Sequence, residues 1–148
     1  MKGVDVHVDT CENLGIFASQ SMDFVFSSHL LEHIVDTKKA LTEWFRVLKN
    51  DGYLILYLPH KELYPNCGEK GANPDHKTDF MPEDIIKVMK EIGGWDLVRN
   101  ETRSQEREYS FFQVYKRRGD DKHLFTCDDK QPEKTAAIVR YGAFGDAI

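Results

Sequence analysis

The sequence predicts an α/β fold with a parallel sheet, and residues 23–60 carry the prediction. Residues 24–26 are a short apolar run that ends at two serines, and residues 53–58 are a nearly unbroken apolar run. A continuous apolar run is typical of a strand that is covered on both faces of a parallel sheet. Between the two runs, apolar side chains recur at the spacing of one helix face, and these are Leu41, Trp44, Phe45 and Leu48. The order strand, helix, strand predicts a right-handed βαβ unit.

The ends of this unit predict where a ligand binds. Asp36 or Thr37 can cap the start of the helix, and Asn50-Asp51-Gly52 can close it. Because both strands of a βαβ unit run the same way, their carboxyl ends meet at one edge of the sheet. Ligands of open α/β sheets bind outside this edge. The edge is predicted to contain Ser27, Ser28 and His29 after the first strand and His60 after the second.

The composition bounds the class of protein. The chain has 148 residues, 41% of them apolar and 30% charged, with a mean hydropathy of −0.53, which indicates about one soluble domain. It contains neither an apolar run of roughly 18 residues nor a signal-peptide core at its start, so we expect a cytoplasmic protein without a membrane span. The net charge of −5 argues against nucleic-acid binding. Three widely spaced cysteines predict neither a disulfide framework nor a zinc site.

The first residues are predicted to form a strand near a sheet edge. Val4, Val6 and Val8 alternate with polar residues, and Asp9 and Thr10 follow. Alternation is typical of a strand with one less covered face.

The central segment carries a resemblance to a known family. DFVFSSHLLEHI, then RVLKNDGYLIL, then LPH resemble the fourth-strand to fifth-strand segment of class I S-adenosylmethionine-dependent methyltransferases, the small-molecule and glycan-modifying kind. The resemblance covers roughly residues 2–116. It implies a three-layer Rossmann-like sheet with S-adenosylmethionine as the cofactor and a small molecule or glycan as the acceptor.

The resemblance also implies roles for individual residues. Asp9 would accept a hydrogen bond from the adenine amino group, with Thr10 beside it, although Asp9 could equally be an ordinary turn residue. Ser27, Ser28 and His29 would border the methionine part of the cofactor, largely through backbone groups.

Two parts of the family's cofactor site have no counterpart before Asp9. These are the glycine-rich loop after the first strand and the acidic residue after the second. We therefore expect the chain to begin inside a gene and to have little or no activity by itself. The family's strand order is 3-2-1-4-5-7-6, so without strands 1 and 2 the edge of residues 23–28 is exposed. We expect residues 4–8 to pair there, or two chains to pair as a homodimer.

The same segment contains HxxEH, which is also the inverted zinc-protease signature. That chemistry needs His29, Glu32 and His33 on a helix, whereas the helical pattern begins only near Asp36. A zinc hydrolase is therefore a remote alternative. His33 and His60 are weak candidates for a general acid or base, and the alternative for His33 is a capping or packing role.

The rest of the first domain continues the same pattern. Residues 61–80 form a long polar loop, typical of a lid or substrate-recognition loop. His76, Lys77 and Asp79 could contact a polar acceptor there, although a merely solvated loop is the simpler interpretation. A helix is predicted from Pro82 to the glycine pair at 93–94. Strands at 95–100 and 111–116 resemble the antiparallel hairpin that ends the methyltransferase sheet.

The composition changes after residue 117. Residues 1–117 are predicted to be the partial methyltransferase domain and residues 118–134 a charged linker. Residues 135–148, an apolar run and a glycine-rich turn, resemble the start of the ADP-heptose:lipopolysaccharide heptosyltransferase family. Too short to fold as a domain, they should be a tail, disordered or borrowed as an extra strand.

The sequence thus predicts that the parent protein transfers a methyl group from S-adenosylmethionine to an oxygen or nitrogen of a small-molecule or sugar acceptor. A non-catalytic assembly or docking module with the same fold is the main alternative.

Overall fold

The computed structural model describes residues 10–103, 108–119 and 136–139, the last of these by their backbone alone. The elements in chain order are β1 (Met22–Ser28), the 3-10 turn η1 (Leu31–His33), α1 (Thr37–Val47), β2 (Leu48–Pro59), α2 (Pro82–Ile92), β3 (Trp95–Thr102), β4 (Ser110–Arg117) and β5 (Ala136–Val139). The predicted βαβ unit is confirmed as β1, α1 and β2, with the two strands parallel. The predicted closing hairpin is confirmed as the antiparallel pair β3 and β4.

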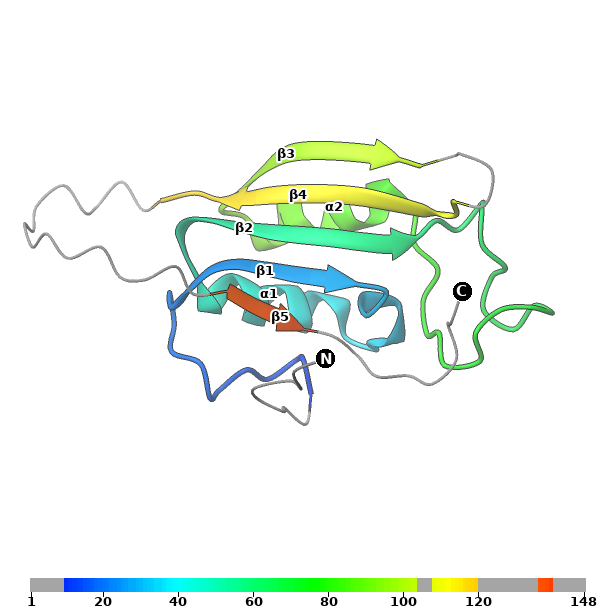
Figure 1. Cartoon of the computed structure of the whole chain (residues 1–148), viewed down its shortest axis with the longest axis horizontal. Helices are drawn as coiled ribbons and strands as arrows, with labels where there is room; N and C mark the ends of the chain where they lie inside the picture. Colours follow the sequence, from blue (N-terminus) through cyan, green and yellow to red (C-terminus); the bar gives the residue numbers. More distant parts are fainter. Residues whose placement is uncertain (1–9, 104–107, 120–135, 140–148) are drawn as a thin grey trace, which may run out of the picture.

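All five strands form one sheet in the order β3-β4-β2-β1-β5 (Figure 1). β4 pairs antiparallel with β2, and β1 pairs parallel with β2. The first four strands of this order correspond to 6-7-5-4 of the methyltransferase pattern. The predicted arrangement of these strands is therefore confirmed.

The edge of β1 that was predicted to be exposed is occupied by β5. Phe24–Ser27 of β1 pair in parallel with Ala136–Val139. Residues 136–139 thus form an extra strand of the sheet, one of the outcomes predicted for the last part of the chain. Residues 4–8, the other predicted partner for this edge, lie outside the described residues.

Both helices lie on the same face of the sheet (Figure 1), and the ion pair of Lys38 Nζ with Glu91 Oε2, 3.1 Å apart, joins them. Alternate residues of β2 point beneath them, and Leu54, Leu56 and Leu58 are fully buried. Tyr53 on the opposite face is 40% exposed. Of the three predicted layers, the described residues contain the sheet and one layer of helices. β2 is therefore fully covered on only one face.

The helix start was predicted correctly, but its end was not. Asp36 caps α1 by accepting a hydrogen bond from the Lys39 backbone N–H at 2.9 Å. α1 ends at Val47, and Leu48, expected in the helical stripe, is the first residue of β2, still fully buried. The chain then bulges before Tyr53 pairs with Phe24. A Cβ on Gly52 would lie 2.9 Å from the Lys49 carbonyl oxygen, so the bulge needs glycine.

The core beneath the helices is apolar, and Trp44 is one of its largest side chains. Trp44 is fully buried, and its indole Nε1 donates a hydrogen bond to the Cys11 carbonyl oxygen at 2.9 Å. α2 begins with Pro82 at its first turn, as predicted, and ends at Ile92, with Gly93 at φ 76° as its C-cap. In the part of the chain that the structure describes, no helix is long and apolar enough to cross a membrane.

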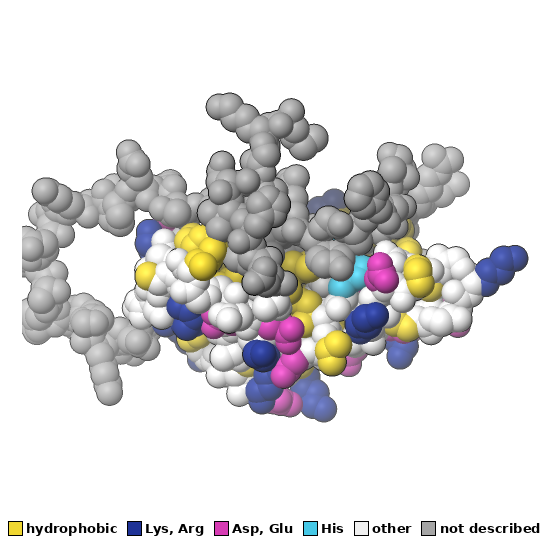
Figure 2. All heavy atoms as spheres, turned by 90° about the horizontal axis from the view of Figure 1, so that it is seen from below, with side chains coloured by type: hydrophobic (Ala, Val, Ile, Leu, Met, Phe, Trp, Pro, Cys, Tyr) yellow, Lys and Arg dark blue, Asp and Glu magenta, His cyan; other side chains and the backbone are white. Residues whose placement is uncertain are grey.

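Charged side chains of both signs are interspersed over the face seen in Figure 2. Among the described residues, Glu43 and Arg46 on α1 form an ion pair with the nearest atoms 2.7 Å apart. The expectation of no nucleic-acid binding stays a prediction.

Candidate functional site at the carboxyl edge of the sheet

The candidate site lies where β1 and β2 end. Ser27 is fully buried, whereas Ser28 is half-buried. His29, directly after β1, has a left-handed backbone with φ 47°, and its N–H donates to the Tyr57 carbonyl oxygen at 2.9 Å. A non-glycine residue in this region is uncommon and is often found at functional sites. The backbone therefore leaves the sheet here in a strained turn.

The His29 side chain faces the neighbouring strands. Its Nε2 lies 3.0 Å from the Ser110 hydroxyl oxygen at the start of β4. Its ring stacks between Tyr57 and Tyr109, with centroid distances of 5.1 Å and 5.7 Å. These contacts fix the imidazole over the carboxyl ends of β1 and β2.

The turn η1 follows and brings Glu32 and His33 into the interior. Glu32 is 1% exposed. The turn has a single 3-10 segment, from Leu31 to His33, and α1 begins only at Thr37. The zinc-protease interpretation of HxxEH requires His29 and His33 to lie on one helix. In this structure they do not.

The loop 61–80 docks on this turn through its backbone. Lys77 and Thr78 both donate their N–H groups to the Glu32 carbonyl oxygen, at 2.7 Å and 3.2 Å. Lys61 N–H donates to the Phe80 carbonyl oxygen at 3.0 Å, so both ends of the loop are held together. The loop is thereby fixed against the carboxyl edge of the sheet.

A second tie inside the loop joins Cys67 to Asp79. The Asp79 carboxylate accepts the Cys67 N–H at 2.9 Å and its thiol at 3.2 Å. Burial and this carboxylate raise the pKa of the Cys67 thiol above its usual value, so the thiol stays protonated at neutral pH.

The docked loop brings His76 to Glu32 and His33. The Nε2 atoms of His33 and His76 each lie 3.9 Å from Glu32 Oε1. The potential ligand atoms of the three side chains all lie within 4.8 Å of one another. Their side chains are 2–8% exposed. We call these three residues the Glu-His-His cluster.

Aromatic rings connect this cluster to His29. His76 stacks edge-on against His33 at 4.7 Å and lies 5.3 Å from Tyr64, which in turn lies 4.9 Å from Tyr109. The Tyr109 ring stacks on the His29 ring, with the centroids 5.7 Å apart. The imidazoles that follow β1 thus belong to one continuous wall of rings, built from three separate segments of the chain.

His60 occupies the other strand end and is 6% exposed. Its Nδ1 accepts a hydrogen bond from the Glu62 N–H at 3.2 Å, and its ring meets Phe111 edge-on at 6.1 Å. A neutral His60 with Nδ1 as the acceptor has its ring proton on Nε2. Whether it acts in catalysis stays a prediction.

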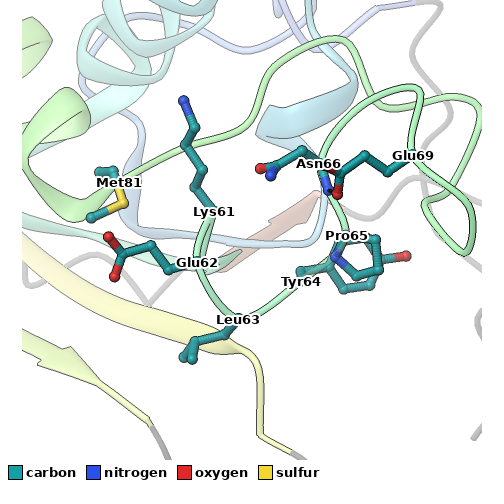
Figure 3. Close-up of a pocket in the computed structure, with 8 residues that line it drawn as sticks. All are labelled: Lys61, Glu62, Leu63, Tyr64, Pro65, Asn66, Glu69 and Met81. Atoms are coloured by element: carbon teal, nitrogen blue, oxygen red, sulfur yellow. Dashed lines mark hydrogen bonds between the residues drawn. The ribbon is translucent and has the colours of Figure 1, made fainter.

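An open groove of about 770 Å³ runs along the first part of the loop. Figure 3 shows Lys61, Glu62 and Met81 at one end, and Asn66 and Glu69 at the other. Its lining carries a cation, two carboxylates and an amide, together with the ring of Tyr64. Such a lining suits a polar molecule rather than an apolar one.

The other predicted site residues differ in how much the structure shows. Asp9 lies outside the described residues. Thr10 is exposed, and its hydroxyl accepts a hydrogen bond from the Glu12 N–H at 3.1 Å. Ser27, Ser28 and His29 lie at the predicted edge, and their part in cofactor binding stays a prediction.

This architecture is similar to that of known proteins. The methyltransferase domain family matches residues 1–56. The chain has the fold of class I S-adenosylmethionine-dependent methyltransferases. This confirms the resemblance of the central segment to class I methyltransferases. No curated protein sequence matches the chain significantly.

Solved methyltransferase structures have the same fold. A S-adenosylmethionine-dependent methyltransferase from Thermotoga maritima is 20% identical, with a TM-score of 0.56 over 74% of this chain and 62% of its own. A S-adenosylmethionine-dependent methyltransferase from Aquifex aeolicus is 19% identical, with a TM-score of 0.56 over 78% of this chain and 55% of its own. The chain therefore spans about 60% of these proteins.

A third similar structure is the [4+2]-cyclase SpnF. It is 12% identical, with a TM-score of 0.61 over 76% of this chain and 55% of its own. Since a cyclase shares the methyltransferase fold, the fold alone does not fix the reaction.

Proposed function

We propose that the protein transfers a methyl group from S-adenosylmethionine to an oxygen or nitrogen of a small-molecule or sugar acceptor. The observation that carries the proposal is the sheet order β3-β4-β2-β1 with β4 antiparallel, which is the order of class I methyltransferases. The family match to residues 1–56 supports it from the sequence.

The carboxyl edge of β1 is the proposed place of the methionine part of the cofactor. His29 turns the backbone sharply there, which leaves the backbone groups of Ser27 and Ser28 at the strand end. Methyl transfer is an in-line displacement in which the acceptor atom attacks the methyl carbon and the sulfur leaves. It depends chiefly on positioning, with a base needed only if the acceptor must lose a proton.

The groove along residues 61–66 is the proposed acceptor site. It opens beside the same edge, because its residues follow directly from β2 and His60. Its volume of about 770 Å³ falls within the usual range for small-molecule sites. The charged and amide groups of the lining favour an acceptor with several hydroxyl or amino groups.

Calorimetric titration of the full-length gene product with S-adenosylhomocysteine tests the proposal. We expect saturable binding, and at least tenfold weaker binding in Ser28→Tyr, because a bulky ring at the strand end blocks approach to the backbone. Ser21→Tyr, just before β1 at its opposite end, is the matched control and should bind normally. Normal melting of both variants is required for the comparison.

Failure of the full-length protein to bind S-adenosylhomocysteine would contradict the proposal. A non-catalytic docking module with a methyltransferase fold would then be the better account, since such a module need not bind the cofactor.

Residues 118–134 are proposed to be a linker and residues 135–148 the start of a second, glycosyltransferase-like domain. The pairing of β5 with β1 is compatible with this division, because a strand from a following segment can extend the sheet. A homodimer through a sheet edge stays a proposal, which light scattering tests. Because β1 is paired on both sides, the edge strands of the sheet are β3 and β5, and a dimer would form through one of them.

A further inference from the structure

We propose that the Glu-His-His cluster of Glu32, His33 and His76 binds a divalent transition-metal ion. Three ligand atoms of the right kinds converge here from two segments, with the nearest pairs 3.9 Å apart. In a tetrahedral zinc site, nitrogen and oxygen ligands lie about 2.1 Å from the metal and so about 3.4 Å from one another. Small side-chain rotations would therefore close the cluster around an ion.

The backbone already holds the three ligands in place. Glu32 and His33 are consecutive on η1, whose His33 N–H donates to the Leu30 carbonyl oxygen at 3.0 Å. His76 is fixed relative to them because the next two residues of its loop, Lys77 and Thr78, donate to the Glu32 carbonyl oxygen. Glu32 would thus supply a ligand through its side chain, and its backbone carbonyl anchors the loop. A preorganised set of this kind lowers the cost of binding.

The three side chains of the cluster are buried from water. A carboxylate that is taken out of water loses its hydration, and a metal cation is one of the ways in which proteins compensate for this loss. The side chains of Glu32 and His76 are 2% and 4% exposed, and that of His33 is 8% exposed. The rings of Tyr64 and Tyr109 continue the wall beyond His76.

The ligand types select the metal. Two imidazoles and one carboxylate suit Zn²⁺, Mn²⁺ or Fe²⁺, whereas Ca²⁺ and Mg²⁺ prefer sites made of oxygen alone. Three protein ligands also leave a coordination position open. This ligand set differs from the HxxEH motif of the sequence, because its third ligand is His76 and not His29.

An open position could hold an oxygen of the acceptor. This role rests on the proposed function: in a methyltransferase, a metal-bound hydroxyl would be oriented beside the methyl donor, and the metal would favour loss of its proton. Metal binding itself does not depend on that role and can be measured without cofactor or acceptor.

The test is calorimetric titration of the metal-free chain with ZnCl₂ and with MnCl₂, together with metal analysis after dialysis. We expect one equivalent of zinc or manganese bound at the cluster, and at least 100-fold weaker binding in both His76→Ala and Glu32→Gln. His29→Ala is the matched control, since His29 also follows β1 but faces Ser110, and it should bind as the wild type does. Loss of binding in His29→Ala with retention in His76→Ala would overturn the assignment.

A measurement on the unaltered chain covers the case of a variant that fails to fold. Addition of Co²⁺ should produce visible absorption bands of a nitrogen- and oxygen-ligated ion that saturate at one equivalent and are displaced by zinc. Absence of such bands, together with absence of stoichiometric zinc or manganese, would contradict the proposal. Because S-adenosylhomocysteine binding is measured separately, this failure would leave the proposed function standing.

Discussion

Two regions of this molecule are equally buried and chemically opposite. Beneath α1, the side chains of Leu41 and Trp44 are fully buried among other apolar groups. At the carboxyl edge of β1, Glu32 is 1% exposed but lies among imidazoles and phenol rings. Burial of apolar surface stabilises a fold, whereas burial of a carboxylate costs free energy unless it is compensated. The first region therefore stabilises the fold, whereas the second is the region for which we propose binding.

The largest effect is expected from a cavity in the apolar region. Trp44→Ala should lower the free energy of unfolding by about 3–5 kcal/mol, because it empties a fully buried site and removes the hydrogen bond to Cys11. Urea unfolding followed by circular dichroism measures this. A loss below about 1 kcal/mol would mean that α1 is not packed as described.

A smaller loss is expected from removal of the Arg117 guanidinium, which lies against the end of α1. Arg117 Nη1 donates to the Phe45 and Leu48 carbonyl oxygens at 2.8 Å and 2.6 Å, and the guanidinium lies 4.1 Å from the Phe45 ring centroid. Arg117→Met should lower the free energy of unfolding by about 2–3 kcal/mol, since both carbonyls lose a charged donor.

Arg117→Lys is the control for charge. A lysine keeps the charge but not the planar fork, so it should recover only part of the loss in urea unfolding. Full recovery would show that charge alone matters at this position.

A pH-dependent contribution is expected on the exposed side of α1. Glu43 accepts hydrogen bonds from Arg46 and from the Leu14 N–H, and chiefly the Arg46 bond lowers the pKa of its carboxyl. A group with a lowered pKa stabilises the fold above its unfolded pKa, near 4.5, and this contribution is lost as the pH falls through the folded pKa.

Glu43→Gln should therefore cost about 1 kcal/mol at pH 7 and less at pH 3. Urea unfolding at both pH values measures the difference. An equal cost at both would mean that the carboxylate charge contributes nothing.

The smallest effect is expected at the Glu-His-His cluster. His76→Phe keeps a ring against His33 and Tyr64, and should change the free energy of unfolding of the metal-free chain by less than about 1 kcal/mol. Metal binding should nevertheless be lost. A destabilisation as large as that of Trp44→Ala would remove the contrast between the two regions.

The apolar region could be predicted from the sequence because its signals are local. The spacing of Leu41, Trp44 and Phe45 specifies a helix face, and the run at 53–58 specifies a strand. The end of α1 could not be placed, because Val47 leads directly into a bulged strand whose shape depends on the close approach of Gly52 to the Asp23 and Lys49 carbonyl oxygens.

The candidate site could be predicted only in part. The strand ends located His29 and His60, and the length of the loop 61–80 marked it as functional. The meeting of His76 with Glu32 and His33 depends on backbone hydrogen bonds between distant segments, which leave no periodic signal. The cluster contains the Glu-His half of HxxEH, but its third member, His76, lies outside the motif.

The most direct test of the contrast is hydrogen exchange of the full-length gene product with and without saturating S-adenosylhomocysteine. If the carboxyl edge is the binding region, amides of residues 27–33 and of Lys77 and Thr78 should exchange more slowly with the ligand, while those of α1 should be unchanged. Protection confined to α1 or α2, or none at all, would contradict the assignment of function to this edge.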